Sequence, residues 1–111
     1  MAAFRTFLAL LFVGLAGYTA IVVGEHGLGL LPVFFGDIAA MGWPGQFNLD
    51  FLMMLSLSAL WTAWRGGFSP GALGLAVLAF SLGASFLTVF LLVLSVRTGG
   101  DARRMLLGVH A

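Results

Sequence analysis

Apolar residues follow one another in three long runs, separated by short clusters of polar residues, glycine and proline. No charged residue occurs from Thr6 to Gly24, from Phe51 to Trp64 or from Gly66 to Val96. A helix that crosses the hydrocarbon core of a bilayer needs about 20 apolar residues, and an uncharged run of about 18 is already a candidate. The pattern therefore predicts an all-α integral membrane protein in one domain, residues 1–111, with transmembrane helices over 4–23, 48–65 and 71–96.

The first run has one alternative interpretation, a secretory signal peptide, because Arg5 precedes it and Ala20 lies near a conceivable cleavage point. The apolar region of a signal peptide is usually about 7–15 residues long, and its cleavage site requires small residues at two spaced positions. Tyr18 and Thr19 occupy the place of such a site. We expect an uncleaved first helix.

Residues 27–43 form an apolar segment that is interrupted by four glycines, Pro32 and Asp37. Proline within a helix removes a donor and clashes with the preceding turn, and a charged aspartate at the bilayer centre costs about 2.5–3.5 kcal/mol. The segment is predicted to be interfacial or re-entrant, with Trp43 at the headgroup level. The alternative is a fourth transmembrane helix.

The second helix has polar residues at its start and aromatic residues at its end. Asn48 is predicted to cap it, with Asp50 in the first turn, where the helix dipole favours negative charge. Trp61, Trp64 and Arg65 are typical of a membrane interface. The C-terminal tail, residues 97–111, has an apolar face too short to span, and we expect it to lie on the membrane surface or to fray.

Orientation normally follows the distribution of arginine and lysine between the loops. Three crossings place Arg5 and Arg65 on one side and Arg97, Arg103 and Arg104 on the other. This difference, two arginines against three, is too small to decide the orientation. Four crossings would place all except Arg65 on one side, which favours the four-helix alternative. Orientation therefore stays open at the level of sequence.

Composition agrees with a membrane location, because 61% of the residues are hydrophobic and 8% are charged, against about 25% charged in a soluble domain. The net charge of +1 favours neither a nucleic-acid surface nor a polybasic patch. With no cysteine there is no disulfide or thiolate chemistry. The expected partners are the lipid bilayer and other membrane subunits or a second copy.

Few polar residues are candidates for chemistry. Asp50 and Asp37 would be functional if they lay within the bilayer, whereas at an interface Asp50 serves only the helix start. Glu25, His26 and His110 form no set of metal ligands with useful spacing. We therefore expect no catalytic residue, cofactor or metal, and a protein that is not an enzyme.

Small residues at helical spacing predict close approach of helices. They lie in the first run and in the third: Ala16, Ala20, Ser81, Gly83 and Ser85. Packing within one bundle is the favoured interpretation, and a dimer interface is the alternative.

The helix that opens near Asn48 and Asp50 and ends with Trp61, Trp64 and Arg65 is followed by a long apolar run. In residues 48–97 the chain resembles small bacterial three-span membrane proteins of unknown function, although it lacks the acid expected beside Arg65. The resemblance implies three spans, with the second helix starting on the periplasmic side. It supplies no activity, because none is established for such proteins. The expected role is an accessory or structural subunit of a larger complex in a prokaryotic inner membrane; the alternative is a protomer of an oligomeric transporter or channel.

Overall fold

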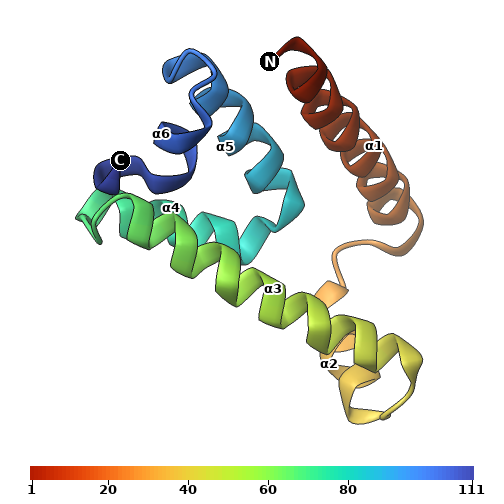
Figure 1. Ribbon diagram of the computed structural model, residues 1–111. Helices are drawn as coiled ribbons and strands as arrows, with labels where there is room; N and C mark the ends of the chain where they lie inside the picture. Colours follow the sequence, from red (N-terminus) through yellow and green to blue (C-terminus); the bar gives the residue numbers. More distant parts are fainter.

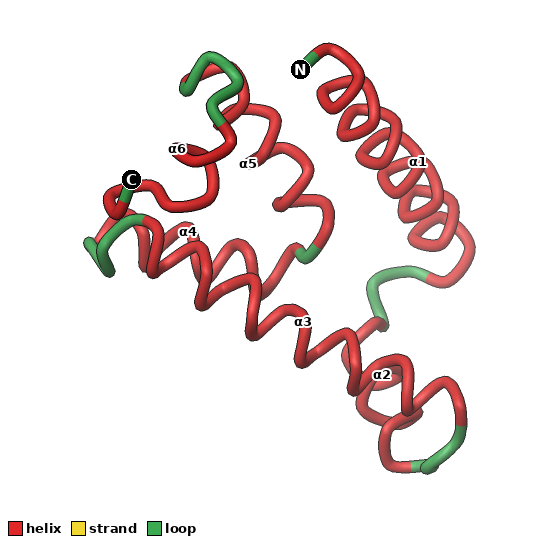
Figure 2. The backbone as a smooth tube through the Cα atoms, viewed as in Figure 1, coloured by secondary structure: helices red, strands yellow, loops and turns green.

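A computed structural model describes all 111 residues, and it is built of helices joined by short turns (Figure 1). The helices, in order, are α1 (Ala2–His26), α2 (Leu30–Ala39), α3 (Trp43–Arg65), α4 (Pro70–Leu82), α5 (Ala84–Arg97), α6 (Ala102–Leu107) and a 3₁₀ turn at Gly108–His110. Figure 2 shows helices and loops but no strand. The predicted all-α class is confirmed.

The first apolar run forms α1, as predicted. By length and composition, α1 is the one helix capable of crossing a membrane, whereas α2, α4 and α5 are apolar but only 10, 13 and 14 residues long. The helix α3 has 23 residues, but its first third carries Gln46, Asn48 and Asp50 among the apolar side chains.

The segment 27–43 contains α2, which packs against the beginning of α3. Pro32 lies in the first turn of α2, where the backbone N–H that it lacks would have no partner within the helix. Asn48 donates a hydrogen bond from Nδ2 to the carbonyl oxygen of Phe34 at 3.1 Å. Gly45 is buried against the backbone carbonyl of Asp37. Ten residues of helix span about 15 Å, half of a hydrocarbon core.

The second predicted helix begins earlier than residue 48, because α3 starts at Trp43. Pro44 lies in the first turn of α3, a position that proline favours because it presets the backbone and needs no donor. The predicted cap by Asn48 is therefore wrong: its side chain joins α3 to α2 instead. Asp50 lies about two turns inside α3 rather than in its first turn.

The third predicted helix, 71–96, is not continuous. Gly83 separates α4 from α5 with φ 59° and ψ −130°, a backbone conformation that essentially only glycine adopts. The chain turns there: α4 packs along α3, and α5 leads away to pack against α1 (Figure 1). Gly83 is buried against the side chains of Phe51 and Leu55 on α3.

Little of the molecule is buried within the chain itself. Twelve of 111 residues are buried, and among them are small side chains on the two helices that pack together, Ala63 on α3 and Ala72 and Ala79 on α4. Large apolar side chains are exposed on every α-helix; examples are Tyr18, Leu31, Met53, Val77, Val89 and Leu106. Apolar surface of this extent is typical of contact with a membrane or with other proteins.

Candidate functional site

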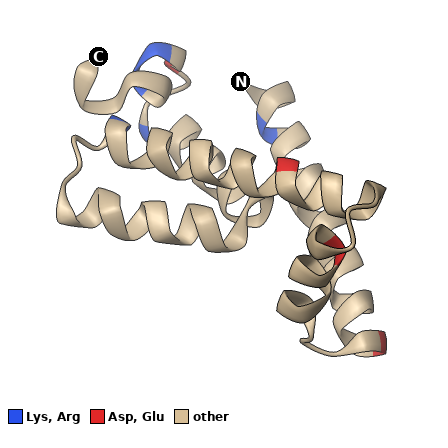
Figure 3. Cartoon of the chain, turned by 90° about the horizontal axis from the view of Figure 1, so that it is seen from below, with Lys and Arg blue, Asp and Glu red and all other residues tan.

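All five arginines lie near the beginning of α1, at the ends of α3 and α5 and in α6, whereas three of the four acids lie at the end of α1, in α2 and in α3 (Figure 3). We use the name arginine end for the ends of α1, α3 and α5 and the α6 helix that carry all five arginines, Arg5, Arg65, Arg97, Arg103 and Arg104, together with Asp101. The acidic end comprises Glu25, Asp37 and Asp50. Hydrogen bonds join α1 to α5 and α3 to α6 at the arginine end, so these helix ends are held together.

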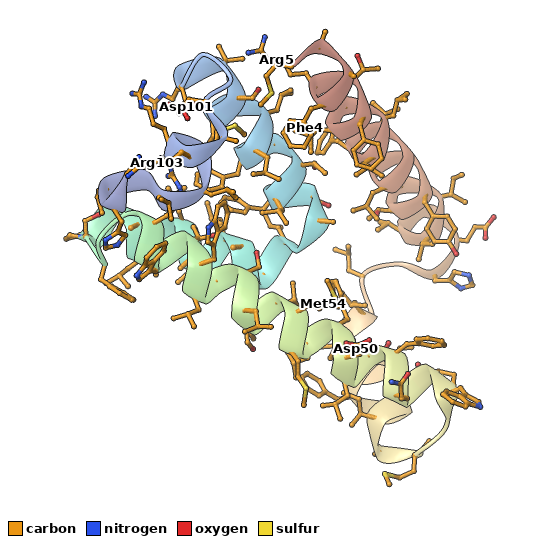
Figure 4. The ribbon with its side chains drawn as sticks, viewed as in Figure 1. Phe4, Arg5, Asp50, Met54, Asp101 and Arg103 are labelled. Atoms are coloured by element: carbon orange, nitrogen blue, oxygen red, sulfur yellow. The ribbon has the colours of Figure 1, made fainter.

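Arg5 joins the beginning of α1 to the end of α5 (Figure 4). Its Nε donates to Ser95 Oγ at 3.0 Å, and its Nη2 donates to the carbonyl oxygen of Ser95 at 2.9 Å. Ser95 is completely buried and its hydroxyl donates in turn to the carbonyl oxygen of Leu92 at 2.7 Å. Hydrogen bonds that involve a charged donor are the stronger kind, so this contact fixes α1 against α5.

Arg65 joins the end of α3 to α6. Its Nε donates to the carbonyl oxygen of Met105 at 2.9 Å, and its Nη2 donates to that of Arg104 at 3.3 Å. These carbonyls belong to the last turns of a short helix, where the Arg104 carbonyl also accepts the backbone N–H of Gly108. The guanidinium also lies 5.5 Å from the centre of the Phe90 ring and 6.0 Å from that of Trp61, within the range of a cation–π contact.

The C-terminal tail folds over the end of α3. Trp61 donates from Nε1 to the carbonyl oxygen of Leu106 at 2.9 Å, and the ring of Trp64 stacks on that of His110 with centroids 4.1 Å apart. Met105 is buried, and Gly108 lies directly on the backbone carbonyl of Arg65. The tail is thus packed on α3 and does not fray, because backbone carbonyls supply acceptors for the Trp61 and Arg65 side chains.

None of the five arginines forms an ion pair within the chain. One ion pair occurs in the structure, between His26 and Glu25 at 3.9 Å, and it is exposed. The carboxylate of Asp101 accepts backbone N–H groups of Arg103 at 3.0 Å and Arg104 at 3.4 Å, so it caps α6 and does not pair with their guanidinium groups. The side chains of Arg97, Arg103 and Arg104 are exposed. They present three positive charges to the surroundings.

The predicted site residues lie in different places. Trp61, Trp64 and Arg65 meet at the arginine end, whereas Trp43 lies at the opposite end of α3 and is exposed. Asp50 is exposed on α3 and Asp37 is half-buried on α2, with no hydrogen bond between their side chains.

The small residues also separate into two groups. Gly83 is buried and Ser85 is half-buried at the turn between α4 and α5, next to the exposed Ser81. Ala16 and Ala20 are exposed on α1. The expected packing of these two alanines inside the bundle is therefore not found. The contact that fixes α1 against α5 lies near the beginning of the helix, where Arg5 binds Ser95 and Leu8 is buried.

Sequence reasoning missed Ser95, Gly108 and His110 as parts of the arginine end. A signal for the tail was present: Asp101 precedes the hexapeptide Ala102–Leu107 and Gly108 follows it, which is the cap chemistry of a short helix. No comparable signal identifies Ser95, because its backbone and hydroxyl resemble those of any serine within an apolar helix.

No group of three His, Cys, Asp or Glu side chains lies close enough to hold a metal ion. A shallow open groove of about 300 Å³ lies on α3 between four apolar residues, Leu57, Leu60, Trp61 and Trp64. Comparisons of the chain with protein-family models, with curated proteins and with solved structures returned no match.

Proposed function

We propose that this chain is a small multi-pass protein of a prokaryotic inner membrane and acts as an accessory or structural subunit of a larger membrane complex. The observation that carries the proposal is an unpacked face of α1 composed of small residues. In this helix only Leu8 is buried. No atom lies within 4 Å of the position where a Cβ would stand at Gly14, Gly17 or Gly24.

Helix geometry places the small residues together. At about 100° per residue, Gly17, Ala20 and Gly24 share one face of α1, and Leu8 lies about 180° from Gly17. The face that contacts α5 and the face of small residues are thus on opposite sides of the helix. One side of α1 packs against α5, and the side with the small residues contacts no other helix of this chain.

A face of small residues is suited to another helix more than to lipid. Within a bilayer, burial from water no longer drives helix association, so close backbone approach and van der Waals packing decide it. Glycine and alanine permit that approach. We infer that a transmembrane helix of another subunit occupies this face.

The test is a substitution that fills the free face. Gly17→Leu is expected to abolish co-purification of the partner subunit in mild detergent, because the leucine side chain holds the two backbones apart. Gly74→Leu on α4, where a Cβ would also meet no atom within 4 Å, is the matched control and should retain the partner. A chain that purifies alone, or a Gly17→Leu variant that keeps its partner, contradicts the proposal.

A second function, a protomer of an oligomeric transporter or channel, is favoured by one observation. Asp50 is exposed about two turns inside α3, where it has apolar neighbours along the helix rather than an N-terminal cap role. An intramembrane carboxylate of this kind is typical of an ion or proton path. Transport in reconstituted vesicles should then be lost in Asp50→Asn and retained in Asp101→Asn, whose carboxylate belongs to the cap of α6. Transport unchanged by Asp50→Asn would dismiss this function.

A further inference from the structure

The lengths of the helices and the positions of their ends limit how this chain fits a bilayer. From Arg5 to Glu25, α1 rises about 30 Å, which equals the thickness of a hydrocarbon core. Helix α3, with 23 residues, rises about 35 Å. The two run in opposite directions: α1 leaves the arginine end and α3 returns to it (Figure 1). Each is long enough for one crossing, and α1 has in addition the apolar composition of a transmembrane helix.

Helices α4 and α5 have another geometry. With 13 and 14 residues, each rises only about 20 Å, too little for the hydrocarbon core. The turn at Gly83 reverses the chain between them. The first residue of α4 follows Arg65 by five positions, and the last turn of α5 carries Ser95, which binds Arg5. Both outer ends of this helical hairpin thus lie at the arginine end.

This arrangement changes the distribution of charge across a membrane. Three continuous crossings would divide the arginines between the two sides, but a hairpin that enters and leaves on one side leaves all five arginines together. Loops on the cytoplasmic side are enriched in arginine and lysine. The acids Glu25, Asp37 and Asp50 then belong to the opposite half. The long dimension of the molecule, 43 Å, matches a bilayer of about 40–45 Å with its headgroup regions.

Three of the arginines are available to a ligand outside the chain. Arg5 and Arg65 already donate to Ser95 and to the carbonyls of α6. Arg97, Arg103 and Arg104 are exposed and form no ion pair. The cytoplasmic leaflet carries anionic phospholipids, whose surface attracts basic residues next to membrane helices, and guanidinium groups bind phosphate oxygens in a bidentate manner.

We propose that α4 and α5 form a re-entrant hairpin, and that Arg97, Arg103 and Arg104 bind anionic phospholipid headgroups of the cytoplasmic leaflet at the arginine end. This inference rests on the membrane location proposed above and not on the identity of a partner subunit. It assigns the orientation: the turns after α1 and after α2 face the periplasm, and the turns after α3 and after α5 face the cytoplasm.

The topology is tested with single cysteines in the full chain, which has none of its own. Leu28, Met41, Phe68 and Ala102 are exposed positions in or beside the four turns. In intact cells, a membrane-impermeant thiol reagent should label Leu28→Cys and Met41→Cys, and should label Phe68→Cys and Ala102→Cys only after permeabilisation. Labelling of Phe68→Cys and Ala102→Cys from opposite sides would mean that 70–97 crosses the membrane, and would overturn the hairpin. Recovery of the chain in the soluble fraction would instead overturn the membrane location itself.

Headgroup binding is tested on the purified chain by native mass spectrometry from detergent with added phosphatidylglycerol or phosphatidylcholine. The triple variant Arg97→Gln, Arg103→Gln, Arg104→Gln should retain phosphatidylglycerol about tenfold less than the parent chain. Glu25→Gln combined with Asp37→Asn changes charge at the opposite end and should leave retention unaltered. Equal retention of the two lipids by the parent chain, or undiminished phosphatidylglycerol retention by the triple variant, would refute headgroup binding.

Discussion

Gly108 is the residue on which closure of the C-terminal tail over α3 depends. Its φ is 55°, and a Cβ at this position would collide with the backbone carbonyl of Arg65. Gly99 has a similar φ of 63°, but a Cβ there would meet no atom within 4 Å. An alanine would strain the backbone at both positions, but only at Gly108 would it also collide with another element. Comparing the two substitutions therefore separates the two effects.

We expect Gly108→Ala to lower the free energy of unfolding by about 1–2 kcal/mol more than Gly99→Ala, because both variants carry a strained backbone but only the first also displaces the tail. Unfolding by sodium dodecyl sulfate in mixed micelles, followed by tryptophan fluorescence, gives the comparison. Trp61 and Trp64 report the tail directly, since they contact Leu106 and His110. Equal losses in the two variants would show that the tail is not held through Gly108.

At the scale of single residues, the sequence predicted which side chains gather at the end of α3 but not the backbone groups that they bind. Trp61, Trp64 and Arg65 were expected together at an interface, and they do lie together. The Trp61 and Arg65 side chains donate to backbone carbonyls of residues about forty positions away, and the Trp64 backbone carbonyl in turn lies 2.9 Å from Nε2 of His110. Every residue has such a carbonyl, so no side-chain pattern distinguishes the ones that are used.

Among the helices, the break at Gly83 has the largest effect on the arrangement of the chain. We expect Gly83→Ala to lower stability by about 1–3 kcal/mol, because alanine rarely adopts the backbone angles found there, and to favour a single helix from α4 through α5. Single-cysteine labelling of Phe68→Cys and Ala102→Cys in the Gly83→Ala background measures this change. The two positions should move to opposite sides in part of the population. Gly74→Ala, in the open middle of α4, should leave them on one side.

The contact of α2 with α3 depends on Gly45, because a Cβ there would collide with the backbone carbonyl of Asp37. We expect Gly45→Ala to separate the two helices and to raise amide hydrogen exchange in Leu30–Ala39 by about tenfold or more. Gly36→Ala, on α2 itself, meets no atom within 4 Å and should slow exchange slightly, since alanine favours the helix. Unchanged exchange in Gly45→Ala would mean that α2 is held by other contacts.

The positions of the apolar runs predicted most of the helical residues but not where helices begin and break. Trp43 was placed in an interfacial segment, because the run of apolar residues weakens before Asn48; Pro44 in the first turn is what begins α3 earlier. Gly83 lies within an uncharged run of thirty-one residues, where a glycine is ordinary. Its backbone angles and its contact with Phe51 and Leu55 on α3, which identify the turn, are properties of the folded chain only.

Over the whole molecule, α1 is joined to the remaining helices mainly through its first turns. Arg5→Gln removes two charge-assisted hydrogen bonds to Ser95, each of which contributes about 1.5–3 kcal/mol. We expect spin labels at Tyr18 and Met54 to report a broader distance distribution in this variant than in the parent chain. Arg103→Gln, whose side chain makes no hydrogen bond within the chain, should keep the parent distribution. An unaltered distribution in Arg5→Gln would show that apolar contacts around Leu8 suffice.

The orientation could not be predicted from sequence because the prediction depended on the number of crossings. The same five arginines are divided or gathered according to whether the chain passes through the bilayer after Pro70 or turns back at Gly83. In the proposed hairpin, the backbone angles of Gly83 decide the orientation of the entire molecule, and hydropathy carries no information about those angles.

The turn at Gly83 also bears on how the protein enters a membrane during synthesis. If both ends of the α4–α5 hairpin stay on the side of the ribosome, the translocation machinery has to move only the segment from Gly24 to Gly42 across the bilayer, a stretch with two acids and no arginine. The α4–α5 hairpin can then partition sideways into lipid as a folded pair of helices, since most of their backbone groups are satisfied within each helix. One translocation event would then suffice for α1, α3, α4 and α5 to enter the membrane, with no arginine carried across.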